Sequence, residues 1–500
     1  MRNTFSITTA FVALSLIAGS SVHAGDVATG MRSTATDAAF GKSKRGFMLI
    51  PQPYTVKSPV FDGAGEPVGE EQQTAVRAHV ELIQVKDTPW VRIRFGQHNL
   101  GAESYMILTS LDDGDRQRLD SWSMPIWQNT SAVFNGTEVE IALFVAPRDK
   151  GVFFTVDEVL VADPEDFAFG TDTVPLPNNT ASLCDDGDDR VPSNDSRVGR
   201  LFFGGCTGWL VHNGAVLTAG HCGEPDGNIT GVLEFNVPAS SPNGVTRSAG
   251  TNDQYPVTGV VSSESNGEGA DYAVFAVGPN SNTGLRAHIA QGFFHMTALI
   301  PSEGRTLRVT GYGLDWSPAG PGGPGAPCCD YDSDEDCDYN CNSANCTQQT
   351  ATGSCDDCLV DYAIEHTVDT APANSGSPII WESTGLAIGI HTQGGCDSFW
   401  SDYDNAGTWL MYPPLASAMN GFLGPNVWWV DGASPNPIQF GHVLYPFNRV
   451  SAAVVSAPDG ATVAIVAGDY PAALGNTFVA GADGRAMTLT AHVGMVRIGN

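Results

Sequence analysis

Three residues whose side chains together support nucleophilic catalysis lie in short, distinctive runs in the middle of the chain. Ser375 belongs to the run NSGSP at residues 374–378, a tight turn that can direct the serine hydroxyl and its own backbone N–H into one pocket. His221 follows the run TAG, and Asp271 opens the run DYAV. Alone, such a histidine is usually structural and such an aspartate usually caps a turn. Together and in this order, they predict a nucleophile, a general base and a carboxylate that orients the base.

The segment from Cys206 to Cys222, CTGWLVHNGAVLTAGHC, resembles the segment that carries the general base in chymotrypsin-like serine endopeptidases. The chain order His, Asp, Ser is also that of this family, and not that of subtilisins or α/β-hydrolases. The resemblance implies that Ser375 attacks the substrate carbonyl, that His221 takes and returns the proton, and that Asp271 holds the imidazole. It also implies a disulfide between Cys206 and Cys222, and a reaction that needs no cofactor and no metal.

The same resemblance places the oxyanion hole at the backbone N–H groups of Ser375 and Ala373. The family usually has glycine two residues before the nucleophile, whereas this chain has Ala373 there, preceded by Pro372. Loss of one donor from such a hole raises the barrier by about 3 to 4 kcal/mol. Activity therefore depends on the backbone conformation of Ala373. A secreted binding or adhesion protein with an inactive protease fold is the alternative.

Within that family, the chain is more similar to bacterial glutamyl endopeptidases, over residues 185–424. Four runs carry the similarity: DDR at 188–190, CTGW at 206–209, NSGSP at 374–378 and GIHTQGG at 389–395. In those enzymes a histidine on a late strand and a serine or threonine shortly before the nucleophile bind the substrate carboxylate. Here the matching residues are His391 and Thr370. A protonated imidazole near a substrate glutamate gains charge-assisted hydrogen bonds, so acidic selectivity is the favoured expectation.

Asp369 supports a rival interpretation of the specificity pocket. It lies shortly before Ser375, where trypsin has the carboxylate that selects Lys and Arg. Some glutamyl endopeptidases also have Asp there without using it for selection, so the position does not decide between acidic and basic substrates. Selectivity for small or apolar residues is a third alternative. For His391, the alternative is a histidine that lines a strand edge without contacting substrate.

The elements that must position these residues are predicted to be strands. Residues 184–425 hold short apolar runs separated by loops, without a sustained helical period, which is typical of all-β barrels or sandwiches. The family resemblance implies a double six-stranded β-barrel. An insert at 317–358 contains seven of the eleven cysteines and predicts a loop cross-linked by disulfides, to which Cys396 is expected to connect. Its acidic run is a candidate calcium site, with a solvated loop as the alternative: Asp330, Asp332, Asp334, Glu335 and Asp336.

Two further segments flank the protease-like one. Residues 25–165 alternate apolar and polar residues in short runs, which predicts a β-sandwich that serves as a pro-segment, a folding aid or a binding module. Residues 166–183 are rich in proline and predict a linker. Residues 426–500 resemble the first coil of the parallel β-helix proteins, and predict a small β module. We expect activation by cleavage between residues 178 and 191.

Residues 1–24 are typical of an export signal. Arg2 provides a positive start, residues 10–18 form an apolar run too short to span a bilayer, and VHA at 22–24 suits cleavage. An unprocessed membrane anchor is the alternative, and no later run is long enough to span a membrane. Secretion would place the cysteines in an oxidising compartment, so disulfides are expected before metal ligands.

Length and charge limit the classes of partner. A chain of 500 residues exceeds one ordinary core, so we expect two or three domains. It has 24 Lys and Arg against 55 Asp and Glu, a net charge of −31. Such a surface repels phosphate backbones and anionic headgroups, which makes nucleic acid an unexpected partner. Proteins and peptides are the expected substrates.

Overall fold

The computed structural model describes residues 49–65, 74–162, 183–184, 189–202, 205–224, 227–239, 246–313, 315–316, 344–345, 347–396, 404–434, 436–476 and 485–499. The expected signal segment, nearly all of the expected linker and the acidic run of the insert lie outside these residues. Among the helices of the described residues, none is both long enough and apolar enough to cross a membrane.

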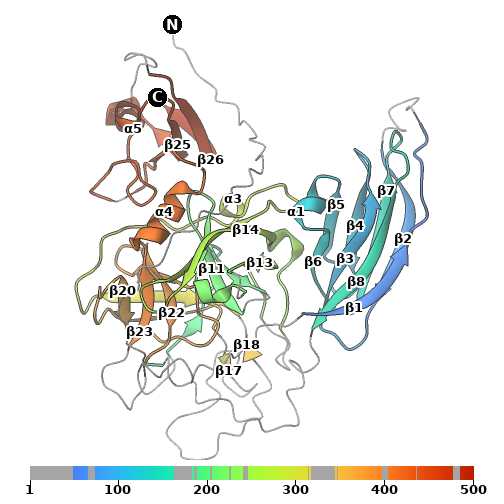
Figure 1. Cartoon of the computed structure of the whole chain (residues 1–500), viewed down its shortest axis with the longest axis horizontal. Helices are drawn as coiled ribbons and strands as arrows, with labels where there is room; N and C mark the ends of the chain where they lie inside the picture. Colours follow the sequence, from blue (N-terminus) through green and yellow to red (C-terminus); the bar gives the residue numbers. More distant parts are fainter. Residues whose placement is uncertain are drawn as a thin grey trace, which may run out of the picture.

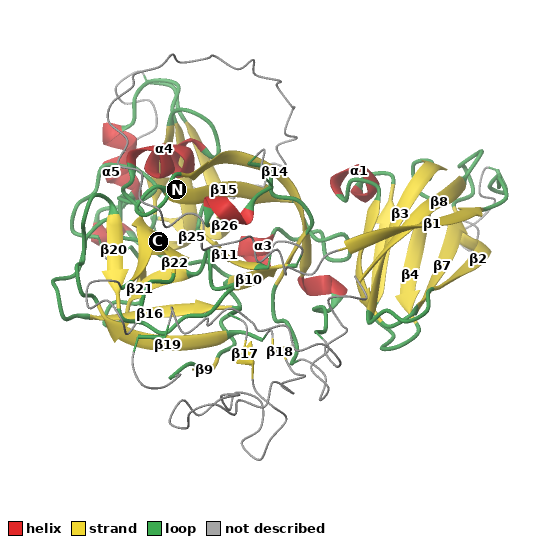
Figure 2. Cartoon of the chain, turned by 60° about the horizontal axis from the view of Figure 1, so that its bottom comes forward, coloured by secondary structure: helices red, strands yellow, loops and turns green. Residues whose placement is uncertain are grey.

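Two four-stranded antiparallel sheets form the amino-terminal part of the structure. One has the order β1 (Leu49–Lys57), β8 (Phe153–Ala162), β3 (Trp90–Asn99) and β6 (Thr130–Asn135). The other has the order β2 (Val76–Gln84), β7 (Glu138–Val145), β4 (Tyr105–Ser110) and β5 (Arg116–Asp120), and a short helix, α1 (Ser123–Ile126), follows β5. Alternate residues of β4 are buried, namely Met106, Leu108 and Ser110, as expected for a sheet with one face in a core. The two sheets enclose a shared apolar core (Figure 2).

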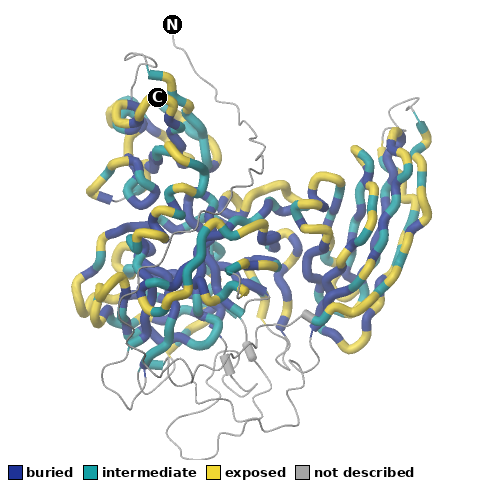
Figure 3. The backbone as a smooth tube through the Cα atoms, in the orientation of Figure 1, coloured by how far each residue is buried: buried dark blue, intermediate teal, exposed yellow. Residues whose placement is uncertain are grey.

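A closed six-stranded barrel follows. Its order is β10 (Val198–Leu201), β11 (Cys206–Leu210), β12 (Val216–Thr218), β15 (Asp271–Val277), β14 (Gln254–Ser265) and β13 (Val232–Glu234). Every residue of β10, β11, β12 and β13 is buried, because one face of these strands lines the barrel and the other packs against neighbouring elements. Figure 3 shows the buried residues gathered in this central region.

A seven-stranded antiparallel sheet forms the second half of the protease segment. Its order is β20 (Ala363–His366), β23 (Asn405–Trp409), β22 (Leu386–Gln393), β21 (Pro378–Trp381), β16 (Thr306–Gly311), β19 (Gln349–Ser354) and β9 (Val191–Pro192). The pair β17 (Asp315–Trp316) and β18 (Ala344–Asn345) lies between β16 and β19 in the sequence. The all-β prediction is confirmed, and the first barrel has the six expected strands. The second sheet differs, because the early strand β9 adds to the edge of β19.

A parallel three-stranded sheet forms the carboxy-terminal part, with the order β24 (Val427–Val430), β25 (Thr462–Tyr470) and β26 (Thr488–Ile498). The helix α5 (Val450–Ser456) covers it, and α4 (Pro413–Gly421) leads into it (Figure 1). Trp429 and Ala464 share an apolar core with Trp209 of the barrel and Met419 of α4. This sheet is therefore packed onto the protease segment.

Candidate active site

His221 and Asp271 meet at one end of two paired strands of the first barrel: His221 lies just after the end of β12, and Asp271 lies at the start of β15. The 3-10 turn η3 (Gly220–Cys222) follows β12, and Asp271 is the first residue of β15. The Nδ1 atom of His221 lies 2.5 Å from the Oδ2 atom of Asp271. The carboxylate side chain is 3% exposed and the imidazole 39% exposed. Because an ionised carboxylate only accepts hydrogen bonds, the imidazole carries its proton on Nδ1 and leaves Nε2 free to accept one.

Hydrogen bonds hold Asp271 in place from both halves of the protease segment. Its Oδ1 atom accepts hydrogen bonds from the N–H groups of Gly220 (2.6 Å) and His221 (3.0 Å). The Thr408 hydroxyl on β23 accepts from the Asp271 N–H at 3.1 Å and donates to the Asp271 carbonyl at 2.8 Å. A side chain at Gly220 would place Cβ 1.9 Å from the carbonyl oxygen of Glu264, so only glycine fits next to His221.

The turn that carries Ser375 is held against β11 of the first barrel. The Thr207 N–H donates to the Ser375 carbonyl at 2.9 Å, and the Thr207 hydroxyl donates to the Ala373 carbonyl at 3.0 Å. Gly376 has φ +91°, and a Cβ there would lie 2.1 Å from the carbonyl oxygen of Thr207. The Cys222 sulfur lies 3.8 Å from the Ser375 carbonyl. The half-buried Ser375 therefore sits beside the segment that carries His221.

Ala373 adopts a backbone conformation that usually belongs to glycine. Its φ is +78°, in the left-handed region. Among the described residues, the N–H groups of Ala373 and Ser375 donate to no other group, whereas those of Asn374 and Gly376 bond to the carbonyls of Ala371 (3.0 Å) and His391 (2.7 Å). The turn thus presents two backbone donors that have no acceptor in the described part of the chain, as the donors of an oxyanion hole should.

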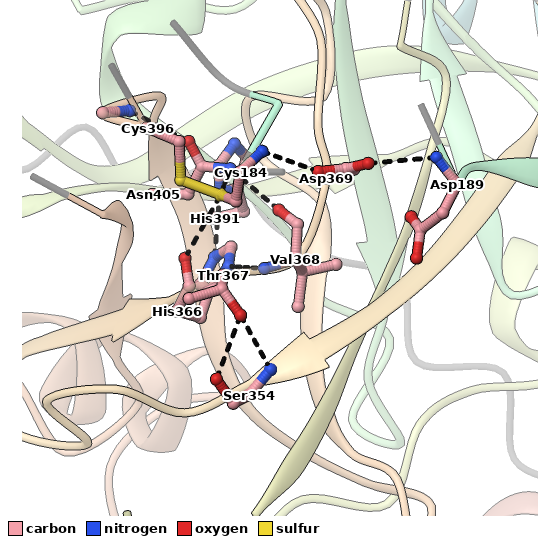
Figure 4. Close-up of a disulfide and its surroundings, with 11 residues drawn as sticks. Cys184, Asp189, Ser354, His366, Thr367, Val368, Asp369, His391, Cys396 and Asn405 are labelled. Carbon is pink, nitrogen blue, oxygen red and sulfur yellow. Dashed lines mark hydrogen bonds between the residues drawn. A yellow bond between two sulfur atoms is a disulfide. The ribbon is translucent and has the colours of Figure 1, made fainter. Parts of the chain in front are cut away.

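His391 lies on β22 and forms a buried pair with a second histidine, His366 of β20 (Figure 4). The Nδ1 atom of His391 lies 3.3 Å from the Nε2 atom of His366, and the Nδ1 atom of His366 accepts from the Val368 N–H at 3.2 Å. A neutral His366 therefore carries its proton on Nε2 and donates it to His391. A neutral His391 then carries its own proton on Nε2, where it is available to a ligand.

Burial keeps both rings uncharged. It lowers the pKa of His366 to about 3. Burial, and then the neighbouring His366 and His221, lower the pKa of His391 well below its ordinary value of 6.5. In the unliganded protein His391 is therefore neutral, and its protonation beside a substrate carboxylate stays a prediction. His391 offers a neutral N–H donor, because removing a charged imidazolium from water at this buried position would cost free energy.

Two buried hydroxyl groups lie near the two histidines in sequence: Thr392 directly follows His391, and Thr370 lies four residues after His366. Thr370 and Thr392 are each at most 3% exposed. Within the described part of the chain, their Oγ1 atoms have no hydrogen-bond partner. A buried hydroxyl without a partner costs free energy unless a ligand supplies one. Thr370, the residue expected to assist His391, therefore has an unused donor.

Asp369 is buried, and both of its carboxylate oxygens are engaged. Oδ1 accepts from the Cys184 N–H at 2.8 Å, and Oδ2 accepts from the Asp189 N–H at 3.0 Å (Figure 4). These bonds tie the start of the protease segment to the region before the nucleophile turn. A carboxylate that already accepts two backbone hydrogen bonds has less capacity for a substrate Lys or Arg.

Disulfides connect the same regions. Cys206 and Cys222 are bonded beside His221, and Cys355 is bonded to Cys358. Cys396 pairs with Cys184, which corrects the expectation that it connects to the insert. The reason is topological: β22 ends near the start of the protease segment, which no local sequence signal indicates. Among the described residues, the one group with metal-ligand spacing is Cys206, His221 and Cys222, and its two cysteines are already bonded to each other.

His366 and Thr408 were missed by sequence reasoning. His366 lies in an ordinary strand-like run, and Thr408 follows a glycine in another. The antiparallel pairing of β20, β23 and β22 places them next to His391 and Asp271. A repeated His on neighbouring strands was the only available signal, and it does not reveal which strands pair.

Part of the chain is similar to a known protein family. Residues 186–399 match the family model described as Trypsin. No curated protein matches the sequence significantly. A solved Glu endopeptidase in complex with MPD is 18% identical, with 47% of this chain and 96% of that chain covered and a TM-score of 0.33. Neuropsin, a serine protease expressed in mouse brain, is 16% identical, with 44% of this chain and 91% of that chain covered and a TM-score of 0.30. The protease Anisep from Arthrobacter nicotinovorans is 12% identical, with 46% of this chain and 98% of that chain covered and a TM-score of 0.30.

The matched residues contain β9 to β22, and with them the barrel, the nucleophile turn and the histidine pair. They lie inside the expected protease segment. The chain therefore carries a chymotrypsin-like serine endopeptidase domain over residues 186–399.

Proposed function

We propose that this protein is a secreted serine endopeptidase that cleaves by means of Ser375, His221 and Asp271 and prefers an acidic residue on the acyl side of the cut. Ser375 attacks the carbonyl carbon while Nε2 of His221 accepts the hydroxyl proton. The proton then passes to the leaving amine, and water repeats the sequence on the acyl-enzyme. Asp271 stabilises the imidazolium that forms. No step requires a metal or a cofactor.

The observation that carries this proposal is the hydrogen bond of 2.5 Å between His221 and the buried Asp271. It fixes the tautomer that a general base needs. The backbone donors of Ala373 and Ser375 support the second requirement, an oxyanion hole, because they have no intramolecular acceptor among the described residues.

The acidic preference rests on the donors near the late strand. His391 presents a neutral Nε2–H, and Thr370 has a buried hydroxyl without a partner within the described residues. Both can donate to a substrate carboxylate, and the approach of that negative charge raises the pKa of His391. Asp369, the group that would select Lys or Arg, is occupied by two backbone N–H groups. The donor set therefore favours Glu or Asp.

Secretion is part of the proposal. Residues 1–24 have the pattern of an export signal, and the disulfides of the described residues suit an oxidising compartment. The high negative charge disfavours nucleic acid as a partner. Protein and peptide chains are the proposed substrates.

The test is cleavage of a mixed peptide library by the secreted protein and by its Ser375→Ala variant, with the residue on the acyl side of each cut identified. We expect cuts after Glu or Asp that vanish in the variant. Cuts after Lys or Arg would transfer selectivity to Asp369. Equal cutting by both proteins would reject the triad. Absence of cutting by either, together with no labelling of Ser375 by a fluorophosphonate, would favour an inactive binding protein.

A further inference from the structure

Two residues of the first barrel belong to the apolar core of the amino-terminal sandwich. Phe202, which follows β10, and Val232 of β13 are fully buried in the core that otherwise consists of sandwich residues. The Phe202 ring packs edge-on against Trp90 of β3, with centroids 5.0 Å apart. The barrel therefore contributes side chains to the sandwich, and the two units share one core at this contact.

A buried amide side chain joins the two units beside this core. The side chain of Gln254, the first residue of β14, donates to the Val133 carbonyl at 2.8 Å and accepts from the Val133 N–H at 2.8 Å. Gln254 thus pairs with an edge of β6 as a neighbouring strand would. It also donates to the Ala249 carbonyl at 2.7 Å. Because both residues are buried, these bonds are excluded from water.

Further polar pairs surround this centre. Asn135 and Ser248 exchange two hydrogen bonds of 2.8 and 3.1 Å. The Thr251 N–H donates to Asp115 at 2.6 Å. Asn282 accepts from the Arg118 N–H at 2.7 Å, and Gln128 donates to the Val257 carbonyl at 2.9 Å. In Figure 1 the sandwich elements α1, β5 and β6 face β13 and β14 across this contact.

This arrangement, an apolar centre with a hydrogen-bonded rim, is that of a stable protein interface. We propose that the amino-terminal sandwich is a permanent subunit of the protease and not a pro-segment that leaves on activation. After cleavage of the chain between the sandwich and the protease segment, it stays bound to the barrel. Its partner is the surface of Phe202, Val232 and Gln254, which would otherwise face water.

The contact lies away from the catalytic carboxylate. Gln254 begins β14, and the antiparallel pairing of β14 with β15 runs from Val257 opposite Val277 to Ser265 opposite Asp271, so Asp271 lies at the other end of this hairpin. This proposal does not depend on the proposed catalytic roles, because binding of the sandwich can be measured in an inactive protein.

The experiment uses the Ser375→Ala protein with a recognition sequence for an external site-specific protease inserted between residues 163 and 182. After complete cutting, we expect the two pieces to co-elute in size-exclusion chromatography at micromolar concentration. Phe202→Ala should raise the dissociation constant of the pieces by roughly 100-fold or more, because it removes the shared aromatic ring. Elution of two separate folded pieces from the cut parent would overturn the proposal.

The matched control is Phe95→Ala, which removes a ring that packs edge-on against Phe154 of β8 inside the sandwich. It should lower the melting temperature of the sandwich without releasing it. Release by Phe95→Ala equal to that by Phe202→Ala would contradict a specific junction. If Phe202→Ala does not fold, Asn282→Ala at the exposed rim tests the same surface, with an expected rise of roughly tenfold or less in the dissociation constant.

Discussion

Two histidines of the protease domain, His221 and His391, differ in their hydrogen-bond partner and in their burial. His221 is partly exposed and bonds to the carboxylate of Asp271, whereas His391 is buried and bonds to a second imidazole, His366. A carboxylate partner stabilises the imidazolium that a general base must become. An imidazole partner in a buried position stabilises only the neutral ring and directs its N–H.

The difference shows that the same residue type serves proton transfer in one place and recognition in the other. Two properties decide the role of each imidazole: the group that is hydrogen-bonded to its Nδ1 atom, and the exposure of the ring to water. The first pair lies at a strand end of the closed barrel. The second lies on the seven-stranded sheet, with His366 on the edge strand β20 and His391 on β22, and β23 runs between these two strands. Substitutions that change the partner of either ring should therefore impair proton transfer at His221 or substrate recognition at His391.

The largest effect is expected when the carboxylate partner of His221 is removed. Asp271→Asn keeps the shape but favours the wrong imidazole tautomer, so kcat should fall by about 10⁴-fold with little change in KM. Steady-state cleavage of a glutamyl peptide measures this. Ser375→Ala sets the background, and a loss below tenfold would mean that Asp271 does not orient the base.

The second effect concerns acid stability. The unfolded chain protonates His366 and His391 below their ordinary pKa of 6.5, whereas burial lowers the folded-state pKa of His366 to about 3 and that of His391 well below 6.5. Their contribution to stability is therefore complete above pH 6.5 and is lost as the pH falls toward 3. His366 should cost about 1.4 kcal/mol per pH unit in this window.

The measurement is calorimetric unfolding of the Ser375→Ala protein between pH 7 and 4. His366→Phe removes one of the protons taken up on unfolding, so its free energy of unfolding should fall less steeply with decreasing pH than that of the parent. Parallel curves for the two proteins would show that His366 is not kept neutral by burial.

The third effect concerns selectivity. His391→Leu removes the neutral donor, so kcat/KM for glutamyl substrates should fall by about 10- to 100-fold, while cutting after other residues continues. Competition between two peptides that differ only in the acyl-side residue measures the ratio. His442→Leu, at another histidine whose pKa burial lowers, to about 4, is the control for lost stability. An unchanged ratio in His391→Leu would remove this residue from the pocket.

The smallest effect on activity is expected for a substitution at Ala373, in the turn that carries Ser375. Ala373 has φ +78°, so Ala373→Gly should relieve backbone strain and raise the free energy of unfolding by about 1 kcal/mol. Because the N–H donor is retained, kcat should stay within about threefold of the parent. Urea unfolding and peptide hydrolysis measure the two quantities, and a destabilised variant would mean that the alanine methyl group packs favourably.

Much of the fold was predictable because short alternating runs separated by turns are typical of antiparallel sheets. The all-β class and the six-stranded first barrel followed from such runs and from the family resemblance. The addition of β9 to β19 was not predictable, since a two-residue strand carries no periodic signal. The contact of the sandwich with Phe202 was equally hidden, because a buried Phe after a strand looks the same whichever core receives it.

For the site, the sequence by itself determined the local chemistry. The runs around His221, Asp271 and Ser375 specify a base, a carboxylate and a nucleophile turn, and the small residues Gly220 and Gly376 permit backbone approaches that no side chain would allow. Only the tertiary structure decided what stands behind each group: His366 behind His391, two backbone N–H groups on Asp369, Cys184 as the partner of Cys396, and a left-handed Ala373. The physical reason is that residue type and neighbours set what a group can do, whereas its pKa, tautomer and availability depend on distant strands that pairing brings into contact.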